Sequence, residues 1–378
     1  MFTLKNLAIV VILGAVIALP GNAREDQNAA IQYLLAVFAN GFSVPAYVDS
    51  ATTVDPLLGF LALLTLEQND FLQREATVTA LARFDKASSL IVCEWGRFEA
   101  DSWEFGARNP IFGLHQLSRT VMLRARRHYE RGDWIQGNRD VENTLLLVRR
   151  MVSLCRPHEH QLFMIENIAN GTAAANLLNI PPDGLADLSF RLDRVGVFFP
   201  MKQMMHDESK RLSKIEKLAL NSKMDRAEIM SRLIPYFADR DMQTTFEILS
   251  PTDQSNAVLG IAEMLSRSSN AISIDLKRAD EEFVKICDQA LPSSRYFSID
   301  QDYFKTELRE NAQAFCRGTI FRSVIARLIA GDADFSTIDD PFGDDHLLLL
   351  TNGTQKKLVS KLRHDSQIDF TFVDSGKR

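Results

Sequence analysis

Apolar residues recur every three or four positions over most of the chain, which predicts a protein built mainly from α-helices. The clearest run extends over residues 111–155 and contains two helices. The first carries one apolar stripe and the second carries two, so the second is expected to be sandwiched between neighbouring helices. The first stripe comprises Leu114, Leu117, Val121, Ala125 and Tyr129, and the two stripes of the second helix comprise Val141, Leu145, Val148 and Val152, and Leu147, Met151 and Leu154.

The same periodicity predicts helices over most of the remaining chain. Two breaks are expected, at Pro181-Pro182-Asp183-Gly184 and at Phe198-Phe199-Pro200, because proline cannot continue a helix. The expected helices cover about residues 29–38, 56–64, 70–95, 157–177, 201–220, 226–238, 257–267, 276–291 and 303–330.

The pattern changes near the C-terminus, where strands are expected. Leu347 to Thr351 is followed by Asn352-Gly353, which predicts a hairpin with those two residues in a type I′ turn. Ile368, Phe370 and Phe372 alternate with polar or outward positions, which indicates a third strand with one face on the helical body. The sequence therefore predicts a mainly α fold, an irregular antiparallel helical bundle or solenoid-like array over residues 24–335, with a small β-meander over residues 336–378.

The first 23 residues have the pattern of a signal peptide. Lys5 precedes an apolar run from Leu7 to Leu19, and Gly21 and Ala23 provide small residues for cleavage. The run is about 13 residues long, against the roughly 20 that a helix needs to cross a bilayer. We expect cleavage after Ala23 and export to the periplasm, the cell envelope or the medium, with no stable membrane insertion afterwards; a retained anchor is the alternative.

Composition narrows the class of protein further. The formal net charge is −6, and the whole-chain balance gives no support for a nucleic-acid-binding surface. The four cysteines permit two disulfides in an oxidising compartment, most simply Cys93 with Cys155 and Cys287 with Cys316. Three connectivities are open, and four buried thiols are the other interpretation.

Four groups of residues have side chains suited to chemistry, and each also has a simpler structural explanation. No cofactor or metal is predicted from them. The metal-like groups are Cys155, His158, His160 and Glu166; Met201, Met204, Met205 and His206; and Asp332, Asp334, Ser336 and Asp340. The fourth group, Glu94, Glu99, Asp101 and Glu104 around Trp95 and Trp103, has the residue types of a sugar-cleaving site, where two acids flank the scissile bond.

The segment from Tyr129 to Trp134 resembles the helix-turn-helix of tetratricopeptide repeats. In that family a small residue, an aromatic residue and a Gly-Asp-aromatic turn lock two helices together. Ala125 stands at the small position, whereas Gly137 and Thr144 stand where the second helix of the family has alanine. The resemblance implies a tight helical hairpin.

A second resemblance covers most of the chain. Cys93-Glu94-Trp95-Gly96, the arginine-rich helix running to Gly132-Asp133-Trp134, and Asp340-Pro341-Phe342-Gly343 before a short β-module are similar to a group of uncharacterised bacterial exported helical proteins. The group implies fold and export, but no activity. We therefore expect a non-catalytic scaffold or interaction module with an unknown macromolecular partner. The alternative is an envelope polysaccharide hydrolase that uses a carboxylate pair near Trp95 and Trp103.

Overall fold

The computed structural model confirms a mainly helical protein with a small antiparallel sheet at its C-terminal end. The structure describes residues 27–39, 66–95, 110–154, 161–197, 200–220, 244, 246–271, 281, 285–286, 301–332, 334–341, 345–353, 355–360 and 369–373.

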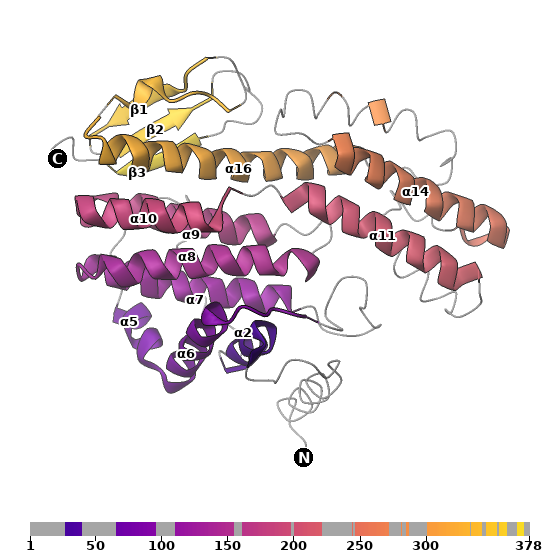
Figure 1. Ribbon diagram of the computed structural model, residues 1–378, viewed down its shortest axis with the longest axis horizontal. Coiled ribbons are helices and arrows are strands. Elements are labelled where there is room, and N and C mark those ends of the chain that lie inside the picture. The colour runs from indigo at the N-terminus through magenta and orange to yellow at the C-terminus, as the bar shows by residue number, and fades with distance from the viewer. Residues whose placement is uncertain are drawn as a thin grey trace.

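The helices form a stack in which successive layers run nearly parallel or antiparallel to one another (Figure 1). α16, α10, α8 and α7 follow one another across the stack, α9 packs on α7, α8 and α16, and α2, α5 and α6 cover the far side of α7. α11 and α14 pack on each other beyond one end of this array. The bounds are α2 Ala29–Ala39, α5 Leu66–Gln73, α6 Glu75–Ser89, α7 Ile111–Glu130, α8 Trp134–Met151, α9 Gln161–Ala175, α10 Pro182–Val195, α11 Pro200–Leu220, α14 Pro251–Ala271 and α16 Gln301–Ile329.

The predicted hairpin between α7 and α8 is confirmed. Gly132 ends the turn at a φ of 76°, a backbone conformation that residues with a Cβ rarely adopt. The carboxylate of Asp133 then caps α8 by accepting a hydrogen bond from the Gln136 N–H at 3.5 Å. This short turn makes the two helices antiparallel neighbours.

Glycines also set how closely the helices approach. A Cβ on Gly137 would lie 2.6 Å from Cε1 of Tyr129, so the ring fills the space that the alanine of the tetratricopeptide pattern occupies. Gly184 of α10 is similarly close to the ring of Trp134, where a Cβ would lie 2.9 Å from Cδ2. Gly137 is therefore a packing requirement of this hairpin, although the tetratricopeptide pattern has alanine at this position.

Two helix predictions require correction. The helix expected over residues 70–95 is two helices, α5 and α6, because the backbone of Arg74 is extended at a ψ of 137° and α6 ends at Ser89. A break does precede α10, but no helix was expected between the two predicted breaks, whereas Pro182–Val195 forms α10 with Pro182 in its first turn. Proline is tolerated there because that turn has no intrahelical acceptor for its N–H.

The helix α2 is built into the core rather than attached to its surface. Asn28, immediately before it, is buried and bonds the chain near Glu94: its Oδ1 accepts from the N–H of Glu94 at 3.1 Å, and its Nδ2 donates to the Glu94 carbonyl at 2.9 Å. The Ala29 N–H donates to the Val92 carbonyl at 2.8 Å. The folded body therefore begins by residue 28.

The sheet contains three antiparallel strands in the order β1 (Leu348–Asn352), β2 (Gln355–Val359) and β3 (Asp369–Val373). Phe370 and Phe372 of β3 are buried, and β3 packs on α9 and α16, as predicted. The turn prediction was wrong at its first residue: Asn352 pairs with Gln355 and so ends β1 instead of lying in the turn. Gly353 has a φ of 60° and supplies the positive φ that the turn needs.

Several predictions fall on residues outside the described ranges, including the signal peptide and the helices expected over 56–64, 226–238 and most of 276–291. Those predictions remain untested. Among the helices that the structure describes, none combines the length and the apolar character required to span a bilayer.

Candidate functional site

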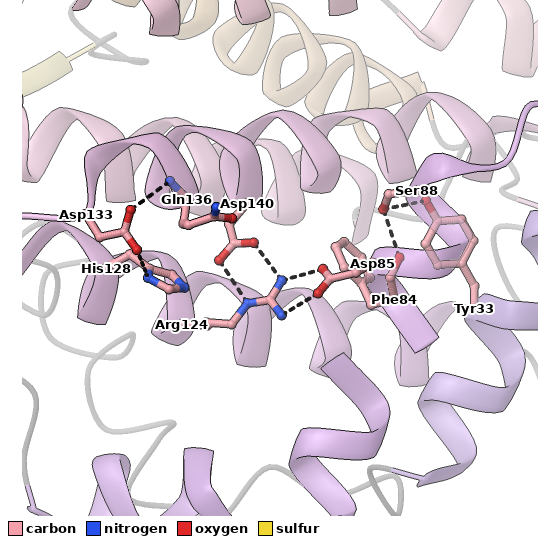
Figure 2. Close-up of polar contacts among 9 residues, drawn as sticks. All are labelled: Tyr33, Phe84, Asp85, Ser88, Arg124, His128, Asp133, Gln136 and Asp140. Carbon is pink, nitrogen blue, oxygen red and sulfur yellow. Dashed lines mark hydrogen bonds and ion pairs between the residues drawn. The ribbon is translucent and has the colours of Figure 1, made fainter. Parts of the chain in front are cut away.

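A group of paired charged side chains lies where α6, α7 and α8 meet (Figure 2). Arg124 of α7 stands between Asp85 of α6 and Asp140 of α8. Its Nε and Nη2 donate to the two carboxylate oxygens of Asp140 at 2.9 and 2.6 Å. Its Nη1 and Nη2 donate to those of Asp85 at 2.9 and 2.6 Å. One guanidinium thus binds two carboxylates, each through both oxygens, and ties three helices together.

Burial governs the electrostatics of this group. The side chain of Asp140 is 5% exposed. Burial raises the pKa of Asp140 to about 6, because the lost hydration outweighs its attraction to Arg124. Burial by itself lowers the pKa of Arg124, but Asp140 and Asp85 more than reverse this effect and keep the guanidinium charged. Since Asp140 is enclosed and both of its oxygens already accept hydrogen bonds, it holds the helices together and is not placed to act on a substrate.

A histidine lies one helical turn further along α7. Nδ1 of His128 is 3.3 Å from Oδ2 of Asp133, the residue that caps α8 (Figure 2). Burial lowers the pKa of His128, Asp133 opposes this, and Arg124 and Arg127 lower it further. The imidazole is therefore neutral near pH 7 and links the end of α7 to the start of α8.

A second polar group joins α8 to α10. Nε of Arg191 donates to Asp187 at 2.8 Å, and its Nη1 donates to Glu142 at 2.7 Å. Asn138 is fully buried and donates to Asp187 and to the Gly184 carbonyl, both at 2.9 Å. Every member of this group has a partner on the other helix or on its own, which fixes the register of α8 against α10.

A third polar group joins α8, α9 and the end of α10. Nη2 of Arg149 donates to the Gly196 carbonyl at 2.9 Å and lies 3.4 Å from Oε1 of Glu166. Burial raises the pKa of Glu166, and the charge of Arg149 opposes this. Glu166, considered above as a metal ligand, is thus part of an ion pair between helices.

Of the predicted carboxylate–tryptophan group, the structure describes only Glu94 and Trp95. Trp95 is 1% exposed, stacks on Tyr33 at 6.2 Å between ring centroids, and donates its indole N–H to the Arg150 carbonyl at 2.5 Å. It is a core residue that cannot stack on a sugar. Glu94 is exposed, whereas Glu99, Asp101, Trp103 and Glu104 lie outside the described residues.

The residues of the methionine group and of the aspartate group likewise have separate structural roles. Met201, Met204 and Met205 are buried in the core and His206 is exposed, which fits packing of α11 rather than a copper site. Asp332 pairs with Arg327, Asp334 caps a short 3₁₀ helix over Phe335–Thr337, and Asp340 accepts a hydrogen bond from Ser360. These carboxylates therefore have separate partners. Within the described residues no three His, Cys, Asp or Glu side chains form a group that could hold a metal ion.

The disulfide predictions are not tested. Cys93 is partly exposed and Cys316 is buried, but Cys155 and Cys287 lie outside the described residues.

The arginines that join helices were not predicted from the sequence. On the arginine-rich helix α7, Arg124 has acidic partners on neighbouring helices, and Arg119 and Arg126 are buried. Arg150 was not singled out, yet it donates to the Ala87 and Leu90 carbonyls at the end of α6 and to the Tyr33 hydroxyl. The sequence did contain a signal for Arg150, since it lies on a helix with two apolar stripes. Such a helix packs on two sides and leaves little room for a solvated side chain.

Comparison with known proteins adds no relative: no protein family, no curated protein and no solved structure matches this chain.

Proposed function

We propose that the chain is an exported, non-catalytic helical protein that acts as a scaffold or interaction module in the periplasm or cell envelope. The observation that carries this proposal is the set of ion pairs between neighbouring helices. Arg124, Arg149 and Arg191 each bind carboxylates across helix boundaries, so these side chains stiffen the array. A rigid body whose interhelical charged groups bind one another suits a protein that presents its surface to a macromolecular partner.

The hydrolase remains the alternative, and its test is direct. Residues 24–378 are incubated with purified envelope polysaccharide, and new reducing ends are measured. The scaffold proposal expects no release above that of heat-denatured protein. Release that is lost in Glu94→Gln or Glu99→Gln, with the fold unchanged by circular dichroism, would instead establish the enzyme.

Export is tested on the full-length precursor in a bacterial host. Fractionation should recover the chain outside the cytoplasm, and mass spectrometry should find Arg24 as its first residue. A cytoplasmic chain that retains Met1 would contradict this part of the proposal.

A further inference from the structure

The outward face of α10 carries an unusual pattern of side chains. α10 lies between α8 and α16 (Figure 1) and buries Gly184, Leu185, Leu188 and Leu192 against the array. The opposite face presents, in steps of three or four residues, Asp183, Ala186, Phe190 and Arg194, all of them exposed. Steps of three and four place residues on one face of a helix, so these four form a single stripe.

Phe190 is the feature of this stripe that needs an explanation. Phe190 is 63% exposed near the middle of the helix, although burying such a side chain is favourable by about 1.5–3 kcal/mol. Arg194 is 62% exposed at its side chain and makes only a 3.4 Å contact with Glu142, which Arg191 binds more closely. Both side chains are therefore accessible to another molecule.

The stripe is complementary to itself. When two copies of α10 pair antiparallel about a two-fold axis near residue 188, Phe190 of one copy lies on Ala186 of the other. The same pairing places Asp183 opposite Arg194, about 8 Å to either side of the axis at 1.5 Å rise per residue. A large side chain then meets a small one twice, and opposite charges meet twice.

From this pattern we propose that the chain forms a symmetric homodimer through the outward face of α10. This inference rests on the proposed function and deepens it, because it names a second copy of the chain as one occupant of the surface. A contact confined largely to one 14-residue helix is smaller than the standard interfaces of specific, stable complexes, which total about 1,200–2,000 Å². We therefore expect a weak dimer that forms only at high protein concentration.

Sedimentation velocity of residues 24–378 from 1 to 300 µM tests the proposal. The wild-type chain should pass from monomer to dimer over this range, and Phe190→Asp should weaken association at least tenfold. Phe112→Asp is the matched control, because Phe112 is similarly exposed (56%) but lies on α7, and it should leave association unchanged. Circular dichroism verifies that both variants are folded.

Charge reversal provides the sharper test. Asp183→Arg and Arg194→Asp should each weaken the dimer, and the double variant should restore it, since the reversed charges again face each other in a symmetric pair. A monomer at 300 µM, equal effects of the two phenylalanine changes, or a double variant as weak as its parents would overturn the proposal. None of these results would disturb the scaffold function, which the polysaccharide and export experiments test separately.

Discussion

The ring of Tyr129 lies directly over the backbone of Gly137, so close that a Cβ at residue 137 would sit 2.6 Å from Cε1. The two residues come from adjacent helices of the α7–α8 hairpin. The Tyr129 hydroxyl also donates to Asn138 at 3.0 Å, which holds the ring in place. The hairpin can therefore close this tightly only because residue 137 has no side chain.

Gly137→Ala is expected to destabilise the protein, although alanine is usually favoured over glycine in a helix by about 0.5–1 kcal/mol. Overpacking against a fixed ring typically costs about 1–3 kcal/mol, so the free energy of unfolding should fall by roughly 1–2 kcal/mol. Urea unfolding followed by circular dichroism measures it.

Gly318→Ala is the matched control for that experiment. Gly318 also lies inside a helix, but a Cβ there would be 3.6 Å from Nδ2 of Asn170 and 3.9 Å from Oε1 of Glu166, which is ordinary contact. This variant should be as stable as the wild type or more stable by up to about 1 kcal/mol. Equal destabilisation by both changes would contradict the packing argument.

The contrast between these glycines shows what sequence can and cannot predict here. The α7–α8 turn was predictable because Gly132-Asp133 is a local signal: positive φ followed by a helix cap. The role of Gly137 was not, since it depends on where a ring from the preceding helix lies. The start of α10 at Pro182 does have a local signal, because proline is favoured in the first turn of a helix, and it was missed because the whole Pro-Pro-Asp-Gly segment was taken as a break.

The polar groups between helices are also only partly predictable from the sequence. The sequence indicates that Arg124 lies on a helix with an apolar face, and that acids on neighbouring helices are plausible partners. It does not indicate that Asp85 and Asp140, which are 55 residues apart in the chain, meet on one guanidinium, because that pairing follows from how three helices are arranged.

Asp140 should make stability depend on pH in a recognisable direction. Its pKa is raised from 3.8 to about 6 in the folded protein, so the folded state binds the proton more tightly than the unfolded state. Its contribution is fully present below about pH 4 and is lost as the pH rises through 6, on the order of 1–3 kcal/mol. Asp140→Asn removes this titration, so the difference in unfolding free energy between wild type and variant should shift by that amount between pH 4 and 7. A difference that is constant across this range would show that Asp140 does not titrate there.

Asn28 should be required for docking of α2. Its side chain accepts from the N–H groups of Ala30 and Glu94, at 3.0 and 3.1 Å, and donates to the Glu94 carbonyl. Asn28→Ala leaves buried backbone groups without these partners, at a cost of about 1–3 kcal/mol. Hydrogen exchange should then be faster in residues 29–39 than in α8, whereas Gln27→Ala, at an exposed neighbour, should change neither. Unchanged protection in α2 would contradict this role.

The aromatic side chains of β3 should hold the sheet on the helical body. Phe372 is fully buried, packs edge-on against Phe335 at 4.9 Å between centroids, and stacks on Phe370 at 6.1 Å; Phe370 in turn meets Phe321 of α16 at 5.5 Å. Phe372→Ala removes the central ring of this chain of contacts, and we expect it to lower the free energy of unfolding by about 3–5 kcal/mol.

Thr371→Ala separates that effect from a simple change in strand propensity, because Thr371 lies on the opposite, partly exposed face of the same strand. It should cost no more than about 1 kcal/mol. In hydrogen exchange, Phe372→Ala should expose the amides of β1 and β2 before those of α7 and α8, since a two-stranded hairpin without its third strand is marginal in water. Comparable effects of the two substitutions would mean that the sheet is held by its backbone hydrogen bonds and not by the aromatic contacts.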